Sequence, residues 1–112
     1  MTNKELIELA AKAAGIEIGW DSQGAFLYEP EICALSDAWN PLTDDGDALR
    51  LAVKLGIDIE FYSDAEKGLV YALNRLHPLD SDNNANEPYG DDPYAATRRA
   101  IVRAAAEIGR TM

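Results

Sequence analysis

The chain has 112 residues, of which 47% are hydrophobic, and its formal net charge is −10. This length suits a single globular domain over residues 1–112 and leaves no room for a second one. The charge disfavours nonspecific binding to nucleic acid or to an anionic membrane, because both would repel the protein. A basic protein partner fits the charge better.

The charge is distributed unevenly along the chain. Residues 1–92 carry 19 acidic and 6 basic side chains, whereas residues 93–112 carry one acid, Glu107, and four arginines. The sequence thus places a basic C-terminal segment on an acidic body. Cys33 is the single cysteine, so no internal disulfide can form. The opening residues show neither a signal peptide nor a membrane span, and we expect a cytoplasmic protein.

The first third of the chain predicts a helix followed by a hairpin. Thr2 and Glu5 have the spacing of a capping box, which predicts a helix over residues 3–14 that ends at Gly15. Residues 16–21 alternate between apolar and polar, which is typical of a strand with one solvent-exposed face. After a turn, residues 25–28 supply the second strand. Residues 31–38 fit a strand, a helical turn or a buried loop equally well, and we assign them as an irregular connection.

The stretch from Trp39 to Ile57 predicts a sharply bounded central helix. Thr43 or Asp44 can accept the free N–H groups of its first turn, and Gly56 can end it. The buried face is predicted from the helical spacing of three apolar residues with two more at its borders: Leu49, Ala52, Val53, Ala48 and Leu55. The acids Asp44, Asp45 and Asp47 are interpreted as partners of the helix dipole rather than metal ligands.

The second half predicts another hairpin, a loop and a final helix. Residues 57–62 alternate as a strand, residues 64–68 form a turn, and residues 69–76 return. Residues 80–92 are rich in Asp and Asn and predict an exposed acidic loop. A helix over residues 93–110 is then expected to pack through Tyr94, Thr97, Ile101, Ala104 or Ala105, and Ile108.

These elements define an α+β fold of order αββαββα, with one four-stranded antiparallel sheet and three helices. The polar face of the strands favours two layers, with helices on one side of the sheet only. A three-layer arrangement is the alternative.

Three blocks of the sequence resemble a known family. TNKELIELAAKAAGI opens the chain, WNPLTDDGDALRLAVKLGI lies at its centre, and DDPYAATRRAIVRAAAEIG lies near its end. Together they resemble the phage ABA sandwich domain family of small phage and prophage proteins. The resemblance implies an α-β-α sandwich encoded by a bacteriophage or prophage and made in the bacterial cytoplasm. It carries over no activity, cofactor or catalytic residue.

A search for catalytic or metal-binding motifs finds little. His77 is the only histidine, and the sequence shows no partners for a His-based catalytic triad. Cys33 lies among acids that would weaken it as a nucleophile, so the expected role of Cys33 is packing. Asp80, Asp82 and Asn84 partly imitate a calcium loop that would end at Asp91. Ala85 stands where that loop needs Gly, so we expect no metal there. We expect no cofactor and no enzymatic activity.

Two groups of residues are candidate contacts for partners. Tyr89 in the acidic loop, with Asp80, Asp82 and Asp91, is the candidate surface for a protein partner. Trp39 and Tyr94, by contrast, are expected in the core. Arg98, Arg99 and Arg103 either contact an anion or balance the acidic body, and charge balance is the preferred interpretation.

Three functions follow from these observations. The first is a non-enzymatic interaction module that acts on a host protein. The second is a small-ligand or nucleotide-binding protein in which the arginines meet phosphate. The third, least favoured, is a metal-dependent hydrolase that uses Asp residues.

Overall fold

The computed structural model describes residues 1–63, 68–74 and 85–112. Over these residues the protein is α+β with the order αβββαβββα, and its strands form two separate three-stranded antiparallel sheets. The expected single four-stranded sheet is therefore wrong. The helices are α1 (Asn3–Ala14), α2 (Asp45–Leu55) and α3 (Pro93–Arg110). The first sheet contains β1 (Ile18–Asp21), β2 (Gly24–Glu29) and β3 (Ala34–Ala38), and the second contains β4 (Ile57–Ser63), β5 (Gly68–Asn74) and β6 (Ala85–Pro88).

The predicted boundaries of α1 and α2 are confirmed, because local capping sets them. Thr2 Oγ1 accepts a hydrogen bond from the Glu5 N–H at 3.1 Å, and Asp44 accepts one from the Asp47 N–H at 2.8 Å. Gly15 and Gly56 end the two helices with φ angles of 68° and 66°. Only glycine takes this left-handed conformation without strain.

The predicted buried face of α2 is correct for Ala48, Ala52 and Leu55 and wrong for Leu49 and Val53. Leu51 and Ala52 lie in the core, whereas Leu49 is 58% exposed and Val53 is 73% exposed. The helix has apolar residues on more than one face, so its periodicity alone could not select the one that packs. Trp39, which precedes the helix, is buried as expected, and its backbone N–H donates to the Ala25 carbonyl at 3.0 Å.

β3 lies in the segment that the sequence analysis assigned as irregular. It pairs with β2 through Tyr28 opposite Leu35 and Phe26 opposite Ala38, with a register shift between the two pairs. Four of its five residues are exposed, so it lacks the alternation by which a strand is predicted. Cys33 precedes it with a φ of 51° and is exposed, which contradicts its expected packing role.

The second hairpin is confirmed, but it belongs to a sheet of its own. Ile57 lies opposite Asn74 and Ser63 opposite Gly68. β6 then pairs with β5, so the predicted acidic loop is wrong over residues 85–88. This strand has the sequence ANEP and no apolar alternation, and its pairing depends on the neighbouring strand. Residues 64–67 of the predicted turn, 75 and 76 of the predicted strand, and 80–84 of the predicted loop lie outside the described residues.

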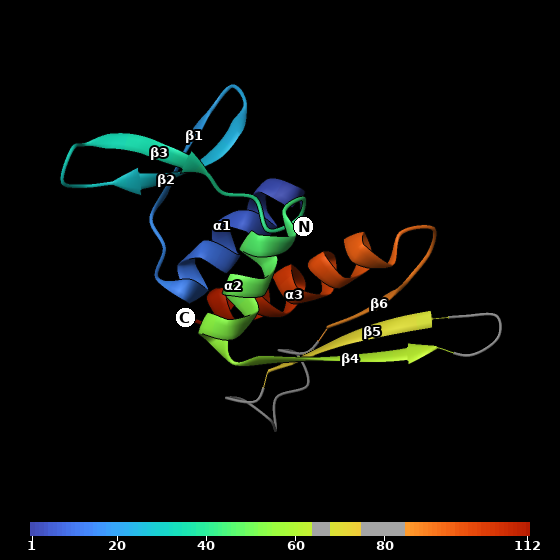
Figure 1. Ribbon diagram of the computed structural model, residues 1–112. Helices are drawn as coiled ribbons and strands as arrows, with labels where there is room; N and C mark the ends of the chain where they lie inside the picture. The colour runs from blue at the N-terminus through green and yellow to red at the C-terminus, as the bar shows by residue number, and fades with distance from the viewer. Residues whose placement is uncertain (64–67, 75–84) are drawn as a thin grey trace.

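The helices lie between the two sheets (Figure 1). α3 packs on the inner face of β4–β5–β6, where Val70 and Ala72 are fully buried. α1 and α2 in turn pack against α3. The α-β-α order is not found, because all three helices lie on one side of the β4–β5–β6 sheet (Figure 1). The two-layer arrangement on a single sheet is not found either, because the helices have a three-stranded sheet on each side (Figure 1).

α3 is the central helix of the fold. Ile101 and Ile108 are buried as predicted, but Tyr94 is 72% exposed, so its expected place in the core is wrong. A run of small residues lets α1 approach closely, and a Cβ atom added at Gly109 would collide with the Leu9 backbone. Among the described residues no helix has the length and apolar character that a membrane crossing needs.

Candidate functional site

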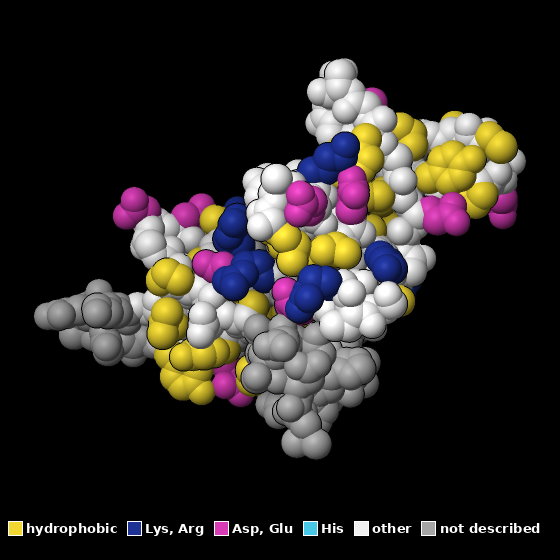
Figure 2. Space-filling model, turned by 180° about the vertical axis from the view of Figure 1, so that it is seen from behind, with side chains coloured by type: hydrophobic (Ala, Val, Ile, Leu, Met, Phe, Trp, Pro, Cys, Tyr) yellow, Lys and Arg dark blue, Asp and Glu magenta, His cyan; other side chains and the backbone are white. Residues whose placement is uncertain are grey.

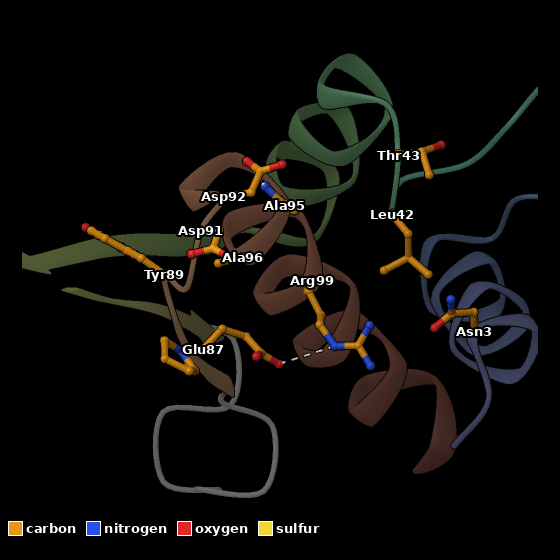
Figure 3. Close-up of a pocket in the computed structure, with 11 residues that line it drawn as sticks. Asn3, Leu42, Thr43, Glu87, Tyr89, Asp91, Asp92, Ala95, Ala96 and Arg99 are labelled. Atoms are coloured by element: carbon orange, nitrogen blue, oxygen red, sulfur yellow. Dashed lines mark hydrogen bonds and ion pairs between the residues drawn. The ribbon is translucent and has the colours of Figure 1, made fainter. Parts of the chain in front are cut away.

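Three of the predicted contact residues line one pocket at the N-terminal end of α3. The pocket has a volume of about 410 Å³ and includes Tyr89, Asp91 and Arg99. Its walls come from β6 and the turn after it, from α3, from residues 42–43 and from Asn3 at the start of α1 (Figure 3). The structure thus joins two groups that the sequence analysis treated separately. Asp80 and Asp82 lie outside the described residues, as does His77.

Backbone contacts fix the acidic side of this pocket. The Tyr89 N–H donates to the Gly68 carbonyl at 2.9 Å, and the Tyr89 ring covers Gly68, where a Cβ atom would collide with it. Tyr89 is therefore half-buried rather than a fully exposed contact. Asp92 accepts hydrogen bonds from the N–H groups of Tyr94 and Ala95 at 3.0 and 3.1 Å, so it caps α3.

Arg99 and Arg103 share one carboxylate. The Arg99 Nε atom lies 3.6 Å from Glu87, and Arg103 lies 2.6 Å from the same Glu87 oxygen. Arg103 also donates to the Asn86 carbonyl at 3.1 Å. The pocket contains three carboxylates, those of Glu87, Asp91 and Asp92, and one arginine, so its own charge is negative.

Arg98 does not line this pocket and joins α3 to the start of α2. Its guanidinium lies 2.6 Å from Asp45 and donates to the Leu42 carbonyl at 2.9 Å, and its side chain is 16% exposed. Acidic and basic side chains lie side by side across the middle of the molecular face that Figure 2 shows. All three candidate anion-binding arginines thus have carboxylate partners, as charge balance requires.

These contacts predict that the two neighbouring arginines differ in their effect on stability. Arg98→Gln should lower the free energy of unfolding by about 1–2 kcal/mol, because it removes a charged bond to a backbone carbonyl. Arg99→Gln should cost about 0–1 kcal/mol, since its ion pair is exposed. Urea unfolding would measure both values. Stabilisation of the parent chain by inorganic phosphate that is lost in Arg99→Gln would instead support the anion interpretation.

An apolar groove lies on the other side of α3, between α2 and β4. We define it by Leu49, Ile59, Phe61, Tyr94 and Ile101, and its volume is about 460 Å³. Leu49, Phe61 and Tyr94 form its rim and are 58%, 60% and 72% exposed. The sequence analysis missed this groove, because it assigned Leu49 and Tyr94 to the core. The sequence did contain one sign of this groove, namely that α2 has more apolar residues than its buried face needs.

The acids at the start of α2 have structural roles. Asp44 caps the helix, and Asp47 accepts from the Asn40 N–H at 3.0 Å and from Arg50 at 2.8 Å. Within residues 1–63, 68–74 and 85–112, no group of three metal-binding side chains comes together. Ala85 is buried in β6, opposite Ala72, and does not form a loop turn there.

One tyrosine on the outer face of the second sheet has a perturbed pKa. The Tyr62 hydroxyl donates to Glu60 at 2.9 Å, and this bond, with the nearby negative charge, raises the pKa of the phenol above its usual value. Tyr62 should therefore ionise at higher pH than an isolated phenol, and Glu60→Gln should return it to the ordinary range. An absorbance titration of phenolate would measure the change. An unchanged titration curve in Glu60→Gln would contradict the contact.

Comparisons of the chain with protein families, with curated proteins and with solved structures find no match. The resemblance to the phage ABA sandwich domain family therefore stays a prediction.

Proposed function

We propose that this protein is a non-enzymatic interaction module that binds a segment of another protein at the N-terminal end of α3. The observation that carries the proposal is the convergence of Leu49, Phe61 and Tyr94 on one preformed groove. Large apolar and aromatic side chains gathered in this way are typical of protein-binding sites. Covering a side chain of this size contributes roughly 1.5–3 kcal/mol when its burial is complete.

The charge beside the groove selects the chemistry of the partner. The groove itself is nearly neutral, because Asp45 and Arg98 pair at its edge. Across the first turns of α3 lies the pocket of Figure 3, in which Glu87 is paired with Arg99 and Arg103, whereas Asp91 and Asp92 form no ion pair with the described residues. A segment that places an apolar side chain in the groove and a Lys or Arg side chain near Asp91 complements both hollows.

The alternatives have less support from the geometry. A nucleotide or other anion would have to displace Asp45 or Glu87 from the arginines, and Asp92 already occupies the N–H groups at the start of α3. A metal-dependent hydrolase would need carboxylates brought together, whereas Asp44 and Asp47 are occupied by backbone and Arg50 contacts. On the family resemblance, we extend the proposal to a host protein in the bacterial cytoplasm.

Selection from a random peptide library displayed on a carrier tests the proposal. The selected peptides should share an apolar or aromatic residue and a nearby Lys or Arg. They should lose binding to a Phe61→Ser and Tyr94→Ser double variant, which keeps the fold because both side chains are largely exposed. Val53→Ser is the matched control, because Val53 is equally exposed on α2 and lies outside the groove. A selection without enrichment, or peptides that bind the double variant as well as the parent, would contradict the proposal.

A further inference from the structure

The β1–β2–β3 sheet projects from the helices as an arm (Figure 1). One of its faces packs on the body. Ala25 is buried, and Ile18, Trp20 and Leu27 pack against the core. The register places these four side chains on the same face, because Ile18 lies opposite Leu27 and Trp20 opposite Ala25.

The opposite face of the arm is also apolar. Side chains alternate along a strand, so Phe26 and Tyr28 point away from the body. Leu35 lies on this same face, since a Cβ atom added at Gly19, directly opposite Phe26, would meet the Leu35 side chain. Ile32 adds a side chain that is 69% exposed at the tip. Hydrophobic side chains are visible over this sheet in Figure 2. Gly19 matters here because the missing side chain makes the space that Leu35 fills.

The charged side chains of the arm are all acidic. Residues 17–38 contain five acids and no Lys, Arg or His. All five acids are exposed: Glu17, Asp21, Glu29, Glu31 and Asp37. Among the described residues none of them forms an ion pair, whereas Asp45, Glu87 and Glu107 are paired with arginines of α3. The acids Glu29 and Asp21 do accept hydrogen bonds, but only from neutral groups, the Ser36 hydroxyl and the Gln23 N–H.

We propose that the outer face of the arm, formed by Phe26, Tyr28, Leu35 and Ile32, is a second docking surface, for a protein surface whose apolar centre is surrounded by Lys or Arg. Unmatched carboxylates around an apolar centre attract such a surface and repel acidic ones. A second copy of this chain, which has a net charge of −10, is disfavoured by the same repulsion. The arm and the groove lie on different elements, so the protein can hold two basic partners, or two parts of one.

Titration of the isotope-labelled protein with an amphipathic peptide of Lys and Leu, followed through its backbone amide signals, tests this surface. Saturable shifts are expected at Phe26, Tyr28, Ile32 and Leu35, and they should persist in Tyr94→Ser, which disables the proposed groove. A matching peptide of Glu and Leu should produce none. Shifts confined to the groove, or no saturable shifts on the arm, would overturn the proposal while leaving the proposed groove function intact.

A pair of charge variants separates local attraction from net charge. Glu31→Gln with Asp37→Asn removes two charges from the arm, and Glu5→Gln with Glu8→Gln removes two exposed charges from α1. The arm variant should bind the Lys and Leu peptide about five-fold more weakly, whereas the α1 variant should bind as the parent does. Ile32→Ser should also weaken binding without a change in Tm. Equal weakening in the two charge variants would overturn the proposal.

Discussion

Ile101→Asp is expected to lower the free energy of unfolding by roughly 3–5 kcal/mol, the largest effect of any substitution considered. Ile101 is 3% exposed and lies where α3 meets both α2 and the β4–β5–β6 sheet. An aspartate there would be desolvated, and Arg98, which lines the same groove, is already paired with Asp45. Because typical domains are stable by only about 5–15 kcal/mol, the variant should be partly unfolded under mild conditions. Urea unfolding followed by circular dichroism would measure the loss.

Two controls make the Ile101→Asp result specific. Ile101→Val keeps the site apolar and should cost about 0.5–1.5 kcal/mol. Val53→Asp puts the same new charge on a side chain that is 73% exposed, and it should cost no more than about 0.7 kcal/mol, the penalty of helix propensity. A Val53→Asp variant as unstable as Ile101→Asp would show that the packed face of α2 is wrongly placed.

Gly109→Ala is expected to destabilise the protein by about 3 kcal/mol, although alanine favours a helix interior over glycine. The reason is the close approach of α1 and α3, since a Cβ atom at residue 109 would collide with the Leu9 carbonyl. Backbone cannot rotate away as a side chain can, so the two helices would have to separate. Thermal unfolding of the variant would show a lowered Tm.

Gly46→Ala is the matched control for the helix contact. Gly46 lies in the first turn of α2, where an added Cβ would lie 3.1 Å from the flexible end of Arg50 and 3.2 Å from the Asp44 carboxylate. This substitution should leave stability within about 0.5 kcal/mol of the parent. A Gly109→Ala variant that gains stability would contradict the packing of α1 on α3.

Helix positions could be predicted from the sequence because their limits are set locally. Thr2, Asp44, Gly15 and Gly56 act on the residues next to them, and each cap was found where the sequence placed it. The face that each helix buries depends instead on its neighbours. Leu49 has the right spacing for a core face, but a neighbouring face of α2 is the one that packs. Tyr94 shares its predicted face with the buried Ile101 and Ile108, but it lies in the first turn of α3 and is exposed.

The strands were predicted only where a hairpin holds them together. β3 and β6 are edge strands, and most of their residues are not buried: four of the five residues of β3 are exposed, and only Ala85 of β6 is buried. Short polar segments such as ANEP carry no sign of this pairing. Because β3 and β6 were not predicted, the two predicted hairpins were assigned to one four-stranded sheet instead of two three-stranded sheets.

The candidate site was predicted in part. Tyr89, Asp91 and Arg99 do line one pocket, although nothing in their spacing indicated that they would meet. The groove beside them could not be predicted, because it needs three elements that only the fold brings together. The surplus of apolar residues on α2 was the one sequence signal for it.

The central claim is that one partner segment uses both the apolar groove and the acidic pocket. Fluorescence anisotropy with a selected peptide tests it most directly through an exchange of charges. Asp91→Lys should weaken binding of the peptide that carries Lys, and a peptide with Glu in place of that Lys should bind Asp91→Lys more tightly than it binds the parent. Equal binding of the two peptides to Asp91→Lys would contradict the account.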